Sequence, residues 1–262
     1  MILQCFAILA ALAVQGPQGA QAPSASSSIH APFTELLRKH TQHGLVDYDA
    51  FAKAPAFDAY LDSLAAARVD ALPRADRFAF WINAYNAYTI QLINKHKERE
   101  SIRNINMVLG VLRGKGPWKE DIVRAGGRVQ SLEDVEKMLR SEYKDLRVHM
   151  ALARATMSSP PLREEAYEGA KLDAQLEDQT RTFLRDRQTD NRLDLGNSQI
   201  YLSPIFDWFH ADFGKGNTGI FKFIAPYFEG EGEKAAFAGS KLTIEYSDYD
   251  WKLNILQPRV TQ

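Results

Sequence analysis

An uncharged stretch from Phe78 to Asn94 constrains this chain more than any other feature. Placed on a helix, the stretch has one broad apolar face and an opposite side that is also largely apolar. The first face carries Phe78, Trp81, Ile82, Tyr85, Tyr88, Leu92 and Ile93, and the other carries Phe80, Ala87 and Ile90. Water can cover little of either side. The pattern therefore predicts a central helix from about residue 75 to 97, packed from two sides.

Two asparagines, Asn83 and Asn86, lie inside this apolar helix. A buried amide without a hydrogen-bond partner costs about 1–3 kcal/mol. We therefore expect both side chains to bind neighbouring backbone. We also count them among the candidate binding residues, although the structural role is favoured.

The composition is that of an ordinary globular protein. The chain has 262 residues, a net charge of −1 and 25% charged residues. It has no basic excess that would indicate nucleic-acid binding, and we expect no nucleic-acid partner. The length predicts a single domain.

The N-terminus predicts export. Residues 2–14 form an uncharged apolar run, which is typical of a signal-peptide core and too short to span a bilayer comfortably. We expect a signal peptide over residues 1–22, a flexible leader over 23–29 and the domain over 30–262. The signal is atypical, because no basic residue precedes the run and Pro23 follows the best cleavage site. The predicted location is the periplasm or the extracellular space, with no membrane span in the mature chain.

Cleavage of that segment would remove Cys5, the single cysteine of the chain. The mature protein would then have no disulfide, no thiolate metal site and no cysteine nucleophile. Cys5 has no lipobox around it, so we do not expect a lipoprotein.

The remaining pattern predicts a helix-rich α+β single domain with a small, mainly antiparallel sheet. Ser131 and Asp134 have capping-box spacing at the start of one helix. The run 147–153 is short and apolar and is interpreted as a buried strand. Other helices are expected over 30–39, 55–68, 131–140, 171–187, 204–213 and 218–228, with a hairpin over 193–202 and a final strand over 241–246.

Five segments together resemble one family, the bacterial and plant domain of unknown function 547. They are Val46–Tyr48, Phe80–Asn86, Ser131–Arg140, His149–Leu152 with Ser159–Leu162, and Tyr249–Asn254. Their order and spacing fit the family over about residues 32–256. The resemblance implies a fold, and it carries no settled activity.

The departures from the family pattern concern its chemistry. Family members usually have two cysteines where this chain has Arg154 and Ser159, and a Glu-His pair where it has Glu136 and Lys137. A cysteine and a histidine in such a family resemble a nucleophile and its base. The resemblance therefore implies that any thiol chemistry is absent here and that the site is degenerate.

Ser159 has two interpretations. It is a serine nucleophile activated by a neutral Lys137 or by His149, or it is a small polar residue in the space of the family's cysteine. A lysine acts as a base only when burial lowers its pKa from about 10.4. The second interpretation is favoured, because a hydroxyl is much harder to ionise than a thiol.

Two further residues near Ser159 are candidates. His149 lies in an apolar run, where a hydrogen-bonded core histidine is the favoured interpretation, although it can line a pocket. Arg154 supplies a permanent cation that suits a carboxylate or phosphate ligand. An ion pair between Arg154 and an acid such as Glu136 is an equal alternative, and Glu136 is a candidate binding residue with it.

Other motifs give weaker signals. Asp207, His210 and Asp212 lack the wider set of ligands that a metal site needs, and we expect no metal. The glycines at 110–116 and 126–127 do not match a phosphate loop, so no cofactor is expected. Trp118 and Asp248–Trp251 are interpreted as packing, with an aromatic platform for sugars or peptides as the alternative.

Taken together, the sequence predicts an exported, non-catalytic binding or scaffold module of the cell envelope. Its ligand or partner would be a small molecule or an envelope protein. The alternative is a serine-dependent hydrolase or acyl-transfer enzyme that uses Ser159 with Lys137 or His149.

Overall fold

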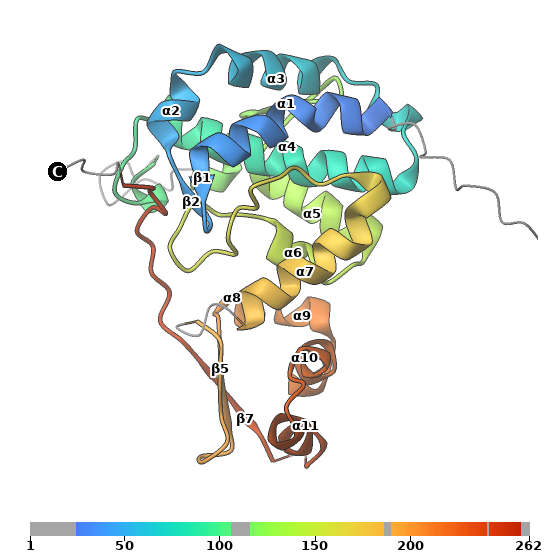
Figure 1. Cartoon of the computed structure of the whole chain (residues 1–262), viewed down its shortest axis with the longest axis vertical. Coiled ribbons are helices and arrows are strands. Elements are labelled where there is room, and N and C mark those ends of the chain that lie inside the picture. The colour runs from blue at the N-terminus through green and yellow to red at the C-terminus, as the bar shows by residue number, and fades with distance from the viewer. Residues whose placement is uncertain (1–24, 106–115, 186–189, 240, 258–262) are drawn as a thin grey trace, which may run out of the picture.

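The computed structural model describes residues 25–105, 116–185, 190–239 and 241–257. Its centre is helix α4 (Arg74–Lys95), and every residue from Phe78 to Ile90 is buried. The predicted central helix, apolar on two sides, is thereby confirmed. Other helices surround α4 in the upper part of Figure 1. They are α1 (Ala25–His40), α2 (Tyr48–Ala52), α3 (Pro55–Ala66), α5 (Leu132–Tyr143), α6 (Val148–Ala151) and α7 (Leu172–Arg185).

Helix α1 begins at Ala25, which is earlier than the expected start of the domain at residue 30. The predicted signal peptide, residues 1–22, lies outside the described residues. Within the described part of the chain, no helix is both long enough and apolar enough to span a membrane.

Within the described residues, the strands form three small sheets in place of the single sheet that the sequence predicts. Two are antiparallel pairs, β1 (Thr41–Gln42) with β2 (Leu45–Val46) and β3 (Val123–Ala125) with β4 (Arg128–Gln130). The third has the order β5-β6-β7, in which β5 (Arg192–Asp194) is antiparallel to β6 (Gln199–Leu202) and β7 (Thr243–Tyr246) is parallel to it. The α+β class is therefore confirmed, with little strand content and one parallel pairing.

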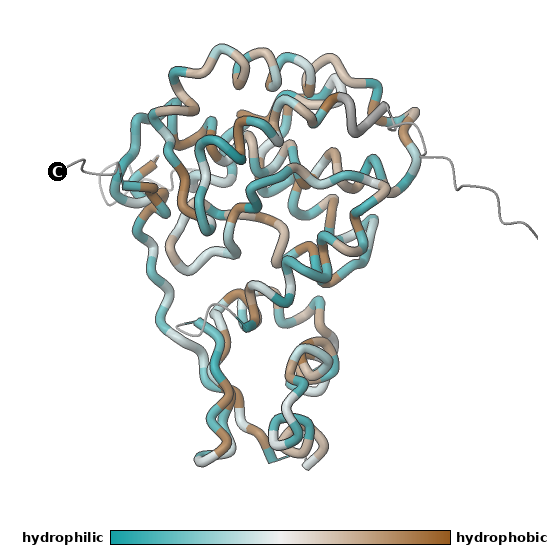
Figure 2. The backbone as a smooth tube through the Cα atoms, viewed as in Figure 1, coloured by the Kyte–Doolittle hydropathy of each residue, from teal (hydrophilic) through white to brown (hydrophobic). Residues whose placement is uncertain are grey.

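The lower part of the molecule has its own apolar core. Around it lie α8 (Ile205–Trp208), α9 (His210–Phe213), α10 (Asn217–Ile224) and α11 (Glu231–Ala238). The helix predicted over 204–213 is in fact two short helices that meet at Phe209. This second cluster includes Phe183, Ile200, Phe206 and Ile224 and is distinct from the cluster around α4. Figure 2 shows apolar and polar residues mixed along the chain in both parts.

Five short 3-10 helices complete the described structure. They are Val69–Ala71, Ile102–Asn104, Pro117–Lys119, Gly169–Lys171 and Ala225–Tyr227. The third of them carries Trp118.

The predicted strand at 147–153 is wrong. Residues Val148–Ala151 form the short helix α6, and the chain becomes extended at Leu152. The Asp145 carboxylate accepts a hydrogen bond from the backbone N–H of Arg147 at 3.0 Å, and the Asp145 carbonyl accepts one from Val148 at 3.1 Å. These contacts close a helical turn. A buried run this short has no period that separates a helix from a strand.

The two asparagines of α4 bind backbone, as predicted. The Asn86 amide donates to the Ala151 carbonyl at 3.0 Å and accepts from the Ala153 N–H at 2.9 Å. Asn83 makes the same pair of bonds with the carbonyl and N–H of Tyr167, both at 2.8 Å. Each amide therefore fixes a non-helical segment against the central helix.

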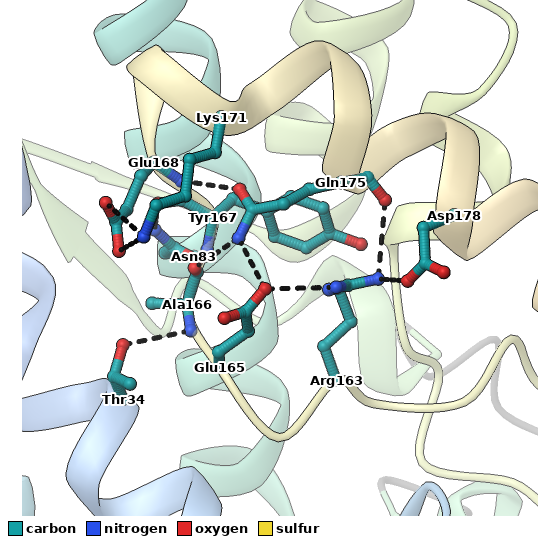
Figure 3. Close-up of polar contacts among 10 residues, drawn as sticks. All are labelled: Thr34, Asn83, Arg163, Glu165, Ala166, Tyr167, Glu168, Lys171, Gln175 and Asp178. Carbon is teal, nitrogen blue, oxygen red and sulfur yellow. Dashed lines mark hydrogen bonds and ion pairs between the residues drawn. The ribbon is translucent and has the colours of Figure 1, made fainter.

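The segment that Asn83 holds is part of a wider polar network, shown in Figure 3. The Arg163 guanidinium contacts Asp178 and Glu165, and the Gln175 amide donates to Glu165 and to the Ala166 carbonyl. Because these contacts join residues 163–168 to α7, they hold the loop that follows Ser159 and the Pro160–Pro161 pair.

Candidate functional site

A pocket of about 440 Å³ lies where the two parts of the molecule meet. Its walls come from five places in the chain: the 3-10 helix at 117–119, helix α5, the segment after α6, the junction of α8 with α9, and the segment after β7. The lining residues are Gly116, Trp118, Lys119, Glu133, Glu136, Lys137, Arg140, Arg154, Trp208, Phe209 and Trp251. Apolar walls with a few convergent polar groups are typical of a small-molecule site.

Helix α5 supplies most of the polar lining. Glu133, Glu136, Lys137 and Arg140 recur at the helical spacing that places residues on one face. The Ser131 hydroxyl accepts from the Asp134 N–H at 3.1 Å, and the Asp134 carboxylate accepts from the Ser131 N–H at 3.2 Å. The predicted capping box therefore begins the helix that carries the site, although the helix runs on to Tyr143, beyond the expected end.

Glu136 and Arg154 form an ion pair at the base of the pocket. The Arg154 guanidinium donates to Glu136 Oε1 at 2.8 Å and to the Leu152 carbonyl at 3.2 Å. The Arg154 side chain is 5% exposed and that of Glu136 is 11% exposed. The ion-pair interpretation of Arg154 therefore holds, and both residues also line the pocket.

Ser159 contacts the backbone of Arg154, and both hydrogen bonds of its hydroxyl are to backbone groups. Ser159 Oγ accepts from the Arg154 N–H at 2.6 Å and donates to the Pro160 carbonyl at 3.0 Å. The residue is buried and is not among those that line the pocket. Its position is therefore that of a small polar residue that closes a turn.

The predicted partners of Ser159 contact other groups. The Lys137 ammonium lies 3.0 Å from Glu133, one helical turn away, and its side chain is 61% exposed. His149 Nε2 lies 2.9 Å from Asp212 Oδ2. Within the described residues, no hydrogen bond joins Lys137 or His149 to the Ser159 hydroxyl.

Asp212 accepts hydrogen bonds from two residues. The Arg140 guanidinium binds its carboxylate through two nitrogens, at 2.6 and 2.8 Å, and His149 binds the same carboxylate. The pKa of Asp212 is lowered, chiefly by the hydrogen bond from Arg140. Asp212 is therefore an ionised acceptor, and His149 Nε2 carries the proton.

Burial makes His149 neutral. The pKa of this imidazole is lowered to about 3, first by burial and then by the charge of Arg154, with Asp212 acting in the opposite direction. The contact with Asp212 is therefore a hydrogen bond of a neutral ring. The other nitrogen, Nδ1, is buried and has no hydrogen-bond partner among the described residues.

Phe209 connects this cluster to the pocket. Its ring lies 4.5 Å from the His149 ring, and the guanidinium carbons of Arg140 and Arg154 lie 4.6 and 5.2 Å from its centre. Such distances are those of cation–π contacts. The Phe209 ring, which lines the pocket, is therefore held in place by the imidazole of His149 and by two guanidinium groups.

Three tryptophans also line the pocket. The rings of Trp208 and Trp251 are stacked at 5.5 Å, and those of Trp118 and Trp251 meet edge to face at 6.3 Å. The Tyr249 ring lies 4.5 Å from Trp251. Trp118 and Trp251 therefore pack on each other, as the packing interpretation predicts, and both also line the pocket. The platform for sugars or peptides stays a prediction.

The segment that carries Trp251 is bound to the loop before Ser159. The Met157 N–H donates to the Lys252 carbonyl at 2.8 Å, and the Asp250 N–H donates to the Ser158 hydroxyl at 3.0 Å. The Thr156 and Tyr249 hydroxyls lie 2.7 Å apart. These contacts position the Trp251 wall.

Two outer segments of the family resemblance meet in space. The Tyr48 hydroxyl donates to Asn254 Oδ1 at 2.6 Å, and the Val46 N–H donates to the Asn254 carbonyl at 2.8 Å. The Asn254 amide donates in turn to the Gly44 carbonyl at 2.7 Å. The motif at 46–48 and the motif at 249–254 are therefore two halves of one docking contact.

The residues weighed as metal ligands do not converge. Asp207 is exposed, and Asp212 is bound to Arg140 and His149. Within the described residues, no group of three or more His, Cys, Asp or Glu side chains is placed to hold a metal ion. Residues 110–115, which include two of the glycines compared with a phosphate loop, lie outside the described residues.

Sequence reasoning missed several residues of the pocket. The sequence does not predict that Arg140, Trp208 and Phe209 lie in the same pocket as Arg154. It also does not predict the contact between Arg140 and Asp212. Helical spacing alone predicts that one face of helix α5 carries Glu133, Glu136, Lys137 and Arg140. The contribution of Phe209 depends on a long-range contact and has no local signal.

Comparisons with known proteins agree with the resemblance. No curated protein and no solved structure matches this chain. The family model described as "Protein of unknown function, DUF547" matches residues 69–184. The match contains the central helix, the capped helix α5, His149 and Ser159, whereas the 46–48 and 249–254 segments lie outside it. Over residues 69–184 the chain is therefore similar to the family that its motifs resemble.

Proposed function

We propose that this protein is a non-catalytic binding module that holds a small molecule in the pocket between α5 and the three tryptophans. In this proposal it is exported and acts in the cell envelope, as its N-terminal sequence predicts.

One observation carries the proposal. The side chains that line the cavity are aromatic or charged, whereas the Ser159 hydroxyl lies outside the lining and is bound by backbone on both sides. A serine nucleophile needs a base within about 2.6–3.2 Å. The two candidate bases, Lys137 and His149, contact Glu133 and Asp212 instead.

The catalytic part of the proposal is tested with a fluorophosphonate, a broad serine-reactive probe, on the wild type and Ser159→Ala. We expect no labelling that depends on Ser159. Labelling of the wild type that disappears in Ser159→Ala would overturn the proposal in favour of a serine-dependent hydrolase or acyltransferase.

The binding part is tested with 8-anilinonaphthalene-1-sulfonate, an anionic aromatic dye that suits an apolar pocket with cationic residues. We expect a saturable fluorescence gain that Trp208→Ala weakens. Trp208 is 43% exposed, so its truncation leaves no buried cavity. Leu195→Ala is the matched control, because Leu195 is 52% exposed and does not line the pocket. An equal dye signal in all three proteins would contradict a site at this position.

A further inference from the structure

The charges around the pocket are arranged in two zones. Glu136 lies at the base, where it is nearly buried beside Arg154. Lys119 and Lys137 lie at the rim, with side chains 59% and 61% exposed. Both rim lysines face a single carboxylate, Glu133, at 3.9 and 3.0 Å. The rim therefore has an excess of positive charge that an anionic ligand group can use.

The base of the pocket has the opposite requirement. Within the described residues, Arg154 is the side chain that donates to Glu136, and it reaches Oε1. A ligand that covers the second oxygen of Glu136 displaces water from it and binds best when it donates a hydrogen bond there, because a buried acceptor without a donor is costly. A hydroxyl supplies that donor.

The walls limit the shape of the ligand. Trp208 and Trp251 present stacked rings, and Trp118 stands edge-on to Trp251. Aromatic rings pack well against flat apolar surfaces while leaving polar edges free for hydrogen bonds. The ligand that meets all three conditions has a flat apolar face, hydroxyl donors along its edge and an anionic group at one end.

We propose that the pocket binds an acidic saccharide: a sugar ring stacks on the tryptophans, a hydroxyl donates to Glu136, and a carboxylate lies at Lys119 and Lys137. This inference rests on the proposed function and names the ligand class of the same site. A planar aromatic acid can stack on the tryptophans and place its carboxylate at the rim lysines, but it brings no hydrogen-bond donor to Glu136. A neutral sugar can stack on the tryptophans and donate a hydrogen bond to Glu136, but it has no anionic group for the rim lysines.

The test is calorimetric titration of the whole protein with three probes: trigalacturonate, maltotriose and 1-naphthoate. Trigalacturonate should bind, and maltotriose and 1-naphthoate should each bind at least fivefold more weakly. Trp208→Ala should weaken trigalacturonate about tenfold through lost ring contact. The double variant Lys119→Gln/Lys137→Gln should weaken it about fivefold and leave the affinity for maltotriose unchanged.

Two controls match these variants. Lys53→Gln/Lys222→Gln removes the same charge from exposed lysines that do not line the pocket, and Leu195→Ala removes an exposed apolar side chain elsewhere. Both should bind trigalacturonate as the wild type does. Circular dichroism of each variant verifies that it is folded.

The outcomes separate the two proposals. If 1-naphthoate binds and trigalacturonate does not, the saccharide class is wrong and the binding function stands. If maltotriose binds as tightly as trigalacturonate, the role of the rim lysines is wrong. Absence of trigalacturonate binding overturns the inference in every case, whereas Ser159-dependent fluorophosphonate labelling overturns the proposed function.

Discussion

Buried polar side chains of this protein act mainly by fixing backbone. Asn86 is the clearest example, because its amide joins α4 to both sides of the segment that leads into Arg154. Ser159 does the same within its turn, where it binds the Arg154 N–H. The base of the pocket therefore depends on residues that do not line it.

Asn86→Ala should lower the free energy of unfolding by about 2–6 kcal/mol. The substitution leaves the Ala151 carbonyl and the Ala153 N–H without their partner, and each unpaired buried group costs about 1–3 kcal/mol. Urea unfolding followed by circular dichroism measures the loss. Asn217→Ala, at an exposed asparagine, should change stability little. Equal stabilities of the two variants would contradict the role given to Asn86.

Two buried histidines should make the protein less stable in mild acid. Burial lowers the pKa of His149 to about 3 and that of His30 to about 4, whereas both lie near 6.5 in the unfolded chain. Between these values the unfolded state binds a proton that the native state does not, so stability falls as the pH falls below about 6.5. Each histidine should contribute about 2 kcal/mol to the loss between pH 6.5 and 5.

Urea titrations at pH 7, 6 and 5 test this expectation. His149→Gln keeps a donor for Asp212 and cannot titrate, so it should flatten part of the pH dependence. His30→Gln should remove a further part of the pH dependence of stability, and the double variant should remove most of that dependence. Asp212 acts in a separate range, because its lowered pKa affects stability below the ordinary carboxyl value. A pH profile identical in wild type and double variant would refute the assignment.

Helix α5 is the element on which the site depends. It carries Glu133, Glu136, Lys137 and Arg140 on one face and is fixed at its first turn by the Ser131 capping box. Because the capping box fixes where the helix begins, it also determines where along the helix these charged side chains lie.

Ser131→Ala should cost about 1 kcal/mol of stability, the usual effect of losing a serine N-cap. Ser131→Thr keeps a hydroxyl acceptor for the Asp134 N–H and should retain most of it. Chemical denaturation measures both variants side by side. A threonine variant as unstable as the alanine variant would show that packing around Ser131, and not the cap, is responsible.

The elements differ in how well local sequence predicts them. Helix α4 was predictable because both of its sides are apolar over many turns, and α5 because Ser131 and Asp134 have capping spacing. Helix α6 was not, since a short buried run has no distinguishing period. The parallel contact of β6 with β7 was not predictable either, because it joins strands far apart in the chain.

The pocket is a property of the whole molecule. Sequence reasoning placed Glu136, His149, Arg154 and Ser159 in one region, but it could not place Trp251 or Phe209 there. These walls come from segments after residue 205 and meet α5 through contacts that no local pattern encodes. The family match likewise ends at residue 184, before either wall.

The two parts of the molecule should differ in local stability. Helix α4 is buried over most of its length, whereas α11 has no buried residue. Amide hydrogens exchange faster where few apolar contacts hold a segment. Hydrogen exchange followed by mass spectrometry should therefore show slow exchange in α4 and much faster exchange in α11. Similar protection of both helices would contradict this.

The docking of Asn254 onto Tyr48 and Gly44 has a consequence for the order of assembly. The ribosome makes α4 and α5 early, but Trp251 emerges after all other residues that line the pocket. The nascent chain can therefore form its central helix while one wall of the cavity is still missing. We therefore expect the pocket to be completed last, when the 249–254 segment reaches the loop that lies about two hundred residues earlier in the chain.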